Sequence, residues 1–474
     1  MPTPDVVVVG SGPNGLVCAV TLARAGRDVL LVEAAGEPGG GLRSAELLEP
    51  GVVHDVCSAV HPFGVASPAL RPLPLGAHGL RFVHPEVPLA HLVDGAPAAL
   101  LHRSLDETVA GLGVDGAAWR TLVGPTVEAG LAISDALLSP LTVPPAVPLE
   151  LARFATVGLQ PARRVARRFT TDRASGLFAG LAAHSFLSLG APLSAAYGLV
   201  LGALGHVVGW PVVAGGSGRL AEALVDELVA HGGALECDRR VRSLDDLPSR
   251  AEVVLDLTPR QVLAVAGERL PARYRRRLAG YRYGPGVHKV DWVLDGPIPW
   301  TDPEVGRAGT VHLAGGVDEV AAAEDDVLAG RLPQRPFVLL GQPCAADASR
   351  VPAGSTRQPV WAYTHVPNGT AVDVTDRIEA RVEAFAPGFR DRIVARHVMG
   401  PAAMEAHDAN YVGGDINGGV ADVAQFIARP TFGLHPWRTP VPGLYLCSAS
   451  TPPGGGVHGM CGWHAAQEVL RARP

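Results

Sequence analysis

Lysine is nearly absent from this sequence of 474 residues. Lysine and arginine together number 40, and only one of them, Lys289, is a lysine. A GC-rich genome favours arginine codons and accounts for the general bias. Arginine cannot replace a compact ammonium group whose pKa changes when it is desolvated. The single retained lysine is therefore a candidate functional residue, although chance retention in a structural ion pair is the alternative.

Paired cysteines are also missing, because the 6 cysteines lie far apart with no Cys-x-x-Cys spacing. This spacing argues against a disulfide framework, a metal site and a redox-active dithiol. It favours a reducing compartment. Since we expect the first strand to begin by Asp5, we also expect no signal or transit segment, and a cytoplasmic protein.

Charge is sparse: charged residues make up 18% of the chain, apolar residues 47%, and the net charge is −6. Nothing in this balance points to nucleic acid as a partner. Residues 174–218 contain no Asp, Glu, Lys or Arg, but glycines and prolines interrupt them repeatedly. We expect buried short helices there and no transmembrane segment, with peripheral membrane contact left open.

A glycine-rich turn near the N-terminus is the clearest positive pattern. Val6–Val9 is a β-branched run, typical of a parallel strand covered on both faces. The GxGxxG motif and a helix follow, which predicts a Rossmann-like domain with the dinucleotide's pyrophosphate at the helix N-terminus. The residues expected to contact the dinucleotide in this turn are Gly10, Gly12, Pro13, Asn14 and Gly15.

A second strand, 28–32, ends in Glu33, which is correctly spaced to bind the adenosine ribose hydroxyls. Ala34, the next expected cofactor contact, and Ala35 follow it. Because no cation is present there for a 2′-phosphate, NADP is disfavoured at this site.

A second glycine-rich turn lies near the C-terminus. We expect a strand over 443–447, then Gly454–Gly456, then a helix from about His458 to Arg471. A nicotinamide-binding domain needs only the first turn, whereas a domain that holds the whole length of FAD needs both. Backbone N–H groups at the second helix start would then stabilise negative charge on the reduced flavin ring. His458 could act as acid or base there, or could cap the helix or line a wall. The expected ring contacts are Ser448, Gly455, Gly456 and Val457.

These segments resemble the phytoene desaturase-like FAD-dependent oxidoreductases, in the branch named pyridine nucleotide-disulphide oxidoreductase domain-containing proteins. The resemblance implies non-covalent FAD and an α/β fold, with a Rossmann-like FAD-binding domain and a discontinuous α+β substrate domain. It also implies that Gly39, Gly40 and Arg43 lie along the pyrophosphate, although Gly41 stands where the family's arginine is usual and Arg43 could equally be a solvated surface residue. The matching segments are 8–16, 54–62, 209–218, 288–292, 413–419 and 443–460.

The expected domains alternate along the chain. The FAD-binding domain is predicted from residues 1–75, 206–272 and 430–474, and the substrate domain from 76–205 and 273–429. Strands at 234–237 and 239–241 would complete the FAD domain, with Val241 near the cofactor. A formal GxGxxA at 216–221 leaves open a second dinucleotide site, although a helix start near the flavin or the substrate channel is the favoured interpretation.

Lys289 and Asp291 share one face of an expected strand over 287–294. In flavin amine oxidases, which look like relatives in fold, a strand lysine holds a water near flavin N5. The hypothesis is that Lys289 does the same here, with Asp291 as its electrostatic partner.

The sequence therefore predicts an FAD-dependent dehydrogenase, desaturase or oxidase. Hydride passes from a C–H bond of an apolar or amphipathic small molecule to flavin N5. Oxygen, a quinone or another carrier could accept the electrons. Two alternatives stay open: a flavin amine oxidase, for which Tyr411 and Trp463 would supply the aromatic cage, and a flavoprotein of little turnover with a structural or partner-sensing role.

Overall fold

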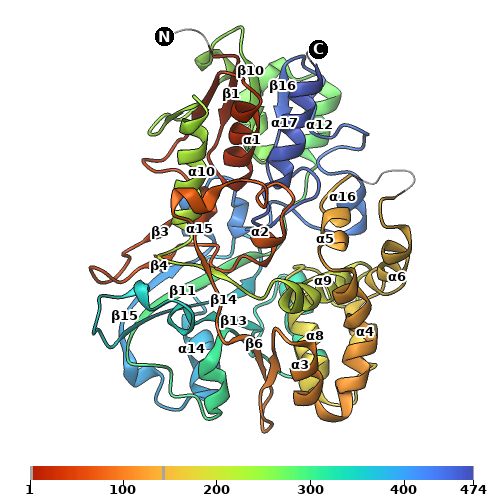
Figure 1. The fold of residues 1–474 in the computed structure, drawn as a ribbon, viewed down its shortest axis with the longest axis vertical. Coiled ribbons are helices and arrows are strands. Elements are labelled where there is room, and N and C mark those ends of the chain that lie inside the picture. Colours follow the sequence, from red (N-terminus) through yellow and green to blue (C-terminus); the bar gives the residue numbers. More distant parts are fainter. Residues whose placement is uncertain (1–3, 141–144, 473–474) are drawn as a thin grey trace.

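The computed structural model describes residues 4–140 and 145–472, and the structural statements below concern these residues. Two sheets lie toward opposite ends of the molecule, and both termini lie beside the first (Figure 1). The five-stranded sheet has the order β16-β10-β1-β2-β9, and the seven-stranded sheet has the order β15-β11-β14-β13-β12-β6-β7.

All neighbours in the five-stranded sheet are parallel. Val6 and Val8 of the central strand face one side, and Val7 and Val9 face the other. Helices cover both sides, which explains why this strand carries four consecutive valines. The strands are β1 (Val6–Val9), β2 (Val29–Val32), β9 (Ala234–Glu236), β10 (Glu252–Leu255) and β16 (Leu444–Leu446), and the covering helices are α1 (Pro13–Arg24), α10 (Gly218–Ala230) and α17 (Met460–Ala472) on one face and α11 (Pro259–Ala266) and α12 (Ala272–Ala279) on the other.

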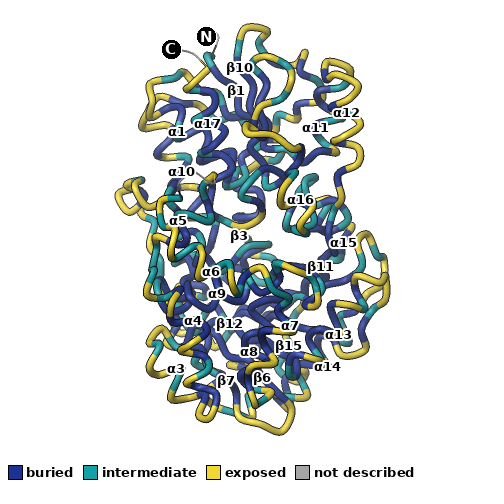
Figure 2. The backbone as a smooth tube through the Cα atoms, turned by 90° about the vertical axis from the view of Figure 1, so that its right-hand side faces the viewer, coloured by how far each residue is buried: buried dark blue, intermediate teal, exposed yellow. Residues whose placement is uncertain are grey.

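The seven-stranded sheet is mixed, with β6 and β12 as its parallel pair. One face packs on α14 (Thr375–Phe385), and the other faces α8 (Asp172–Ala183), α9 (Ser194–Val207) and α13 (Val317–Leu328). Apart from the edge strands β9 and β15, the strands of both sheets are largely buried (Figure 2). They are β6 (Val87–Leu92), β7 (Ala99–Leu101), β11 (Gly286–Asp295), β12 (Ala308–Leu313), β13 (Val338–Gly341), β14 (Arg357–Val366) and β15 (Ile393–Met399).

The remaining helices and two short strand pairs lie outside the two sheets. No described helix is long and apolar enough to cross a membrane. Residues 174–218, which contain no Asp, Glu, Lys or Arg, form α9 and most of α8, and both helices are buried as expected. The remaining helices are α2 (Pro62–Ala66), α3 (Leu105–Gly111), α4 (Gly116–Ala129), α5 (Leu131–Leu137), α6 (Pro148–Gly158), α7 (Ala162–Ala166), α15 (Pro401–His407) and α16 (Val423–Ile427), and the strand pairs are β3 (Ser44–Ala45) with β4 (His54–Asp55) and β5 (Phe82–Val83) with β8 (Val212–Val213).

The α/β fold class with a Rossmann-like domain is confirmed. Each strand of the five-stranded sheet falls inside the segments assigned to the FAD-binding domain, although the exact boundaries of the two domains stay a prediction. The strand expected at 239–241 is wrong: Asp238 has a positive φ of 56°, which turns the chain after β9, and Val241 is buried in irregular structure.

The glycine-rich segment before α10 binds protein side chains. Ser217 N donates to Asp55 Oδ1 (2.7 Å) and Gly218 N donates to Ser44 Oγ (3.0 Å). Since these N–H groups at the helix start already have partners, the geometry disfavours a second dinucleotide site there.

Candidate functional site

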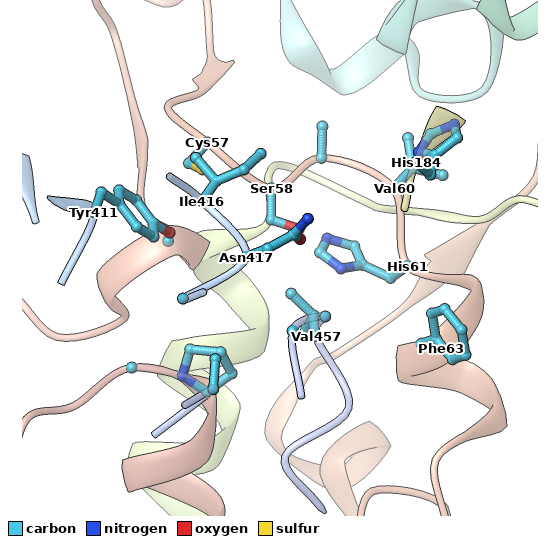
Figure 3. A pocket seen from close by; sticks show the side chains of 18 of the residues that line it. Cys57, Ser58, Val60, His61, Phe63, His184, Tyr411, Ile416, Asn417 and Val457 are labelled. Atoms are coloured by element: carbon cyan, nitrogen blue, oxygen red, sulfur yellow. The ribbon is translucent and has the colours of Figure 1, made fainter. Parts of the chain in front are cut away.

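A cavity lies where the two sheets and the two glycine-rich turns meet (Figure 3). The N-terminal turn contributes Gly12–Asn14 to its lining, and the C-terminal turn contributes Gly455–Val457. These segments are far apart in the sequence, but β16 joins β10 beside β1 and so brings them together. Both predicted turns therefore line one cavity.

The β1–α1 turn depends on close backbone approach. A Cβ at Gly15 would lie 2.0 Å from the carbonyl oxygen of Gly10, and Gly10 itself has a φ of +97°. Pro13 occupies the first turn of α1, where its missing N–H costs nothing. Asn14 Oδ1 is buried without a hydrogen-bond partner in the described structure. The turn thus presents a helix N-terminus and an unused polar atom at the cavity.

Glu33 is placed at the carboxyl end of β2, where it organises the first turn. Its Oε2 accepts hydrogen bonds from Ser11 N (2.9 Å) and Ser11 Oγ (2.6 Å), and its Oε1 accepts one from Ala35 N (2.8 Å). Arg43 Nη2 lies 3.4 Å from Glu33 Oε1, and both side chains are buried. Arg43 is therefore not the solvated surface residue that the sequence left open. Glu33, Arg43 and the exposed Ala34 are not among the residues that line the cavity.

Gly39 and Gly40 pack directly on the first turn. Gly39 has a φ of +118° and donates its N–H to Ser11 O (3.0 Å), and a Cβ at Gly40 would lie 3.1 Å from Gly12 Cα. At Gly41 a Cβ would lie 2.1 Å from the Tyr411 hydroxyl. The place where the resembling family has an arginine is thus next to Tyr411, which lines the cavity.

The C-terminal turn is equally constrained. Gly454 and Gly456 have φ values of +118° and +124°, and a Cβ at Gly455 would lie 2.8 Å from Asn417 O. Ser448 also lines the cavity. Only a glycine-rich backbone fits between the cavity and the Asn417 segment.

His458 does not line the cavity. Its Nδ1 accepts a hydrogen bond from Met460 N (3.0 Å), and burial lowers the pKa of the imidazole to about 4. Helix α17 begins at Met460, two residues later than expected, because His458 satisfies the N–H of its first residue. This geometry favours the helix-capping alternative over acid or base catalysis.

Lys289 and Asp291 form a buried ion pair on β11. Lys289 Nζ lies 2.5 Å from both carboxylate oxygens of Asp291, and His54 Nδ1 lies 3.6 Å from Oδ1. Burial raises the pKa of Asp291, but the Lys289 charge and the His54 contact outweigh it and lower the pKa. Neither side chain lines the cavity; Tyr363, directly opposite Lys289 on β14, does. The hypothesis of a lysine near N5 stays a prediction.

Several lining residues escaped sequence analysis. Trp361 and Tyr363 of β14 lie with ring centroids 6.1 Å apart and planes at 12°. Of the two aromatic residues suggested by sequence, Tyr411 lines the cavity and Trp463 does not. The alternation in β14 could have indicated one shared face, but only the fold shows that this face meets the cavity. The lining residues missed include His61, Phe63, His184, Tyr197, Trp210, Asp256, Trp361, Tyr363 and Asp408.

The two ends of the cavity differ in the titratable groups that line them. Asp256 and Asp408 lie beside the N-terminal turn, and burial raises the pKa of both carboxyls, that of Asp256 to about 8. The other end, which Trp210, Trp361 and Tyr363 line, is called the aromatic end here. There, burial lowers the pKa of His61 to about 4 and that of His184 to about 3. Both imidazoles are therefore neutral at pH 7. Within the described residues, no group of acidic, histidine and cysteine side chains is arranged to hold a metal ion.

Comparison with known proteins agrees with this architecture. Residues 8–73 match the model of the NAD(P)-binding Rossmann-like domain. The chain is 28% identical over 310 residues to the rat protein named pyridine nucleotide-disulfide oxidoreductase domain-containing protein 2, covering 57% of this chain and 53% of that one. This chain is a relative of that protein. The match spans about half the length of the relative.

Solved structures share the fold over nearly the whole chain. An oxidoreductase from Methanosarcina mazei superposes with a TM-score of 0.66 at 15% identity, covering 98% of this chain and 99% of the other. Cyclohexylamine oxidase from Brevibacterium oxydans gives 0.60 at 16% identity, covering 99% of each chain. At such identities the likeness establishes the fold alone. The phytoene desaturase-like subtype stays a prediction.

Proposed function

We propose that this protein is an FAD-dependent oxidoreductase that takes hydride from a C–H bond of an apolar or amphipathic small molecule. The observation that carries the proposal is the shared cavity, which both glycine-rich turns line. A nicotinamide-binding domain needs only the first turn. A cofactor with an ADP half and a redox ring at its other end uses both.

The residues present fit FAD. The N-terminus of α1 suits the pyrophosphate, and Glu33 lies at the strand end where ribose hydroxyls bind. The Gly455–Val457 backbone lines the cavity and carries no side chain larger than valine, so a flavin ring could approach it closely. When bound, FAD supplies the hydride acceptor; the protein supplies position, exclusion of water and electrostatics.

The lining of the aromatic end supports an uncharged substrate. Trp210, Trp361 and Tyr363 provide ring surfaces, and His61 and His184 are neutral at pH 7. Among the described lining residues, both carboxylates belong to the opposite end, beside the N-terminal turn. A cationic substrate would find no countercharge at the aromatic end, whereas an apolar one would find matching surface.

An amine oxidase is the second candidate. The parallel rings of Trp361 and Tyr363 could flank an amine, and the fold is shared with cyclohexylamine oxidase. A flavoprotein of little turnover is the third. The electron acceptor is proposed to be oxygen or a quinone.

Anaerobic titration separates these candidates. We expect the purified protein to bind FAD and to bleach at 450 nm when an apolar alkene precursor is added without air. Bleaching by an amine but by no apolar compound would support the amine oxidase. Resistance to every reductant, dithionite included, would contradict both enzymatic proposals.

A further inference from the structure

Asp256 occupies the place where the α1 N-terminus would meet an anion. It follows β10 directly, and its backbone N–H donates to Val9 O (2.8 Å) at the end of β1. Its Oδ2 accepts a hydrogen bond from Gly15 N (2.9 Å) in the first turn of α1. A Cβ at Gly12 would lie 2.9 Å from the same oxygen. One carboxylate oxygen therefore fills the centre of the glycine-rich turn.

The surroundings of Asp256 hold no compensating positive charge. The carboxyl is buried, and no ion pair includes it within residues 4–140 and 145–472. Besides burial, the charges of Glu33 and Asp408, both acidic, raise the pKa of Asp256 by repulsion. Burial raises the pKa of Asp408, and the nearby Arg43 charge lowers it. Cys447, which follows β16, and Cys461 of α17 lie near Asp256, and burial raises the pKa of both thiols, so both are neutral. An ionised Asp256 would therefore repel a pyrophosphate strongly.

We propose that Asp256 binds the FAD pyrophosphate as a neutral carboxylic acid. One oxygen keeps the hydrogen bond from Gly15 N, and the other carries a proton and donates it in a hydrogen bond to a phosphate oxygen. The inference rests on the proposed FAD function and adds that cofactor binding is coupled to one proton on this side chain. The site therefore combines a helix N-terminus with an acid, where other anion sites use a basic residue.

The coupling has a definite direction. In the FAD-free protein, burial first, and then the neighbouring carboxylates, raise the pKa of Asp256 to about 8. Below that pH the carboxyl is already protonated, and FAD affinity is independent of pH. Above it a proton must be taken up before FAD binds, so the dissociation constant rises about tenfold for each further pH unit.

The test measures the dissociation constant of FAD for FAD-free protein by quenching of flavin fluorescence between pH 6.5 and 9.5. We expect a flat region followed by weakening of about tenfold per unit. Asp256→Asn keeps an acceptor for Gly15 N and a donor for phosphate, so it should bind FAD as tightly at pH 9.5 as at pH 6.5. ADP, which carries the pyrophosphate, should reproduce the wild-type slope, and riboflavin, which has no phosphate, should not.

Asp408→Asn is the matched control, because Asp408 is a second, half-buried acid that lines the same cavity. The slope should persist in this variant. A wild-type affinity that does not change with pH, or a slope that survives in Asp256→Asn, would overturn the assignment while leaving the FAD proposal intact. Failure of the wild-type protein to bind FAD at any pH would overturn the proposed function itself. The wild-type curve requires no variant to fold, and circular dichroism checks both variants.

Discussion

The Lys289–Asp291 ion pair on β11 is buried at both side chains. Two charges in such a place are stable only because each compensates the other. His54 and His397 lie 3.6 and 4.0 Å from the Asp291 carboxylate and complete its surroundings. The rarity of lysine singles out Lys289, and strand periodicity indicates Asp291 as its partner, but neither places the pair beside Tyr363, which lines the cavity. That placement depends on the pairing of β11 with β14.

Lys289→Met is expected to destabilise the fold by about 3–5 kcal/mol, because it leaves Asp291 buried without its ammonium partner. The double variant Lys289→Met/Asp291→Leu should recover most of this loss. Urea unfolding measures the free energy in each case. Arg219→Met, which removes an exposed pair with Glu222, is the control and should change it by less than about 1 kcal/mol. A loss for Lys289→Met as small as the control's would refute the account of the pair.

Lys289→Arg tests the separate hypothesis that this ammonium acts near flavin N5. In FAD-loaded protein we expect slower flavin reduction and reoxidation by stopped flow, at normal FAD content. Unchanged rates would refute that role and leave the structural ion pair as the explanation.

At the scale of elements, α8 packs on the seven-stranded sheet through glycines. Gly176 and Gly180 lie one turn apart, and a Cβ at Gly180 would lie 2.5 Å from His312 Nδ1 and 2.9 Å from His91 Nδ1. His184, one turn further along, contacts His312 with Nε2 atoms 3.2 Å apart. The two glycines thus make room for a buried row of histidines. Sequence analysis predicted a buried helix here, but three separate chain segments supply the row, so no local pattern revealed it.

Gly180→Ala should destabilise the protein by about 1–3 kcal/mol, because the added methyl group forces the histidine rings apart. Gly202→Ala in α9 is the matched control: its Cβ would meet Leu181 and Trp119 at ordinary distances of 3.6 and 3.7 Å. Alanine there should be neutral or stabilising by up to about 1 kcal/mol, since glycine weakens a helix interior. Thermal unfolding of both variants checks the difference, and equal effects would contradict the packing described.

At the scale of the whole molecule, the sequence predicted best what is local. The strand, turn and helix of residues 6–24 match closely, since four valines, three glycines and Pro13 each favour the observed conformation. The strand predicted over 239–241 was wrong, because the positive φ of Asp238 turns the chain before it reaches Val241. The aromatic end of the cavity could not be predicted, because Trp361 lies at the cavity only as a result of the strand order in the seven-stranded sheet.

Buried histidines make the stability of the folded molecule depend on pH. Burial, with smaller contributions from His184 and His91, lowers the pKa of His312 well below 6.5. The unfolded chain therefore binds a proton that the folded chain does not, and the stabilising contribution, complete above pH 6.5, is lost as the pH falls below it. Relative to His312→Phe, wild-type protein should lose up to about 1.4 kcal/mol of unfolding free energy per pH unit between pH 6 and 4.5. Carboxyl groups whose pKa is raised by burial have the opposite effect, and comparing the two proteins cancels it. Parallel curves of unfolding free energy against pH would contradict the prediction.

A crystal structure of the protein with FAD tests the central claim most directly. The account predicts the ADP half against Gly10–Gly15 and Glu33, and the isoalloxazine ring against Gly455–Val457 with one face toward Trp361 and Tyr363. A cofactor bound at the first turn alone, with its redox ring away from Gly455–Val457, would contradict it.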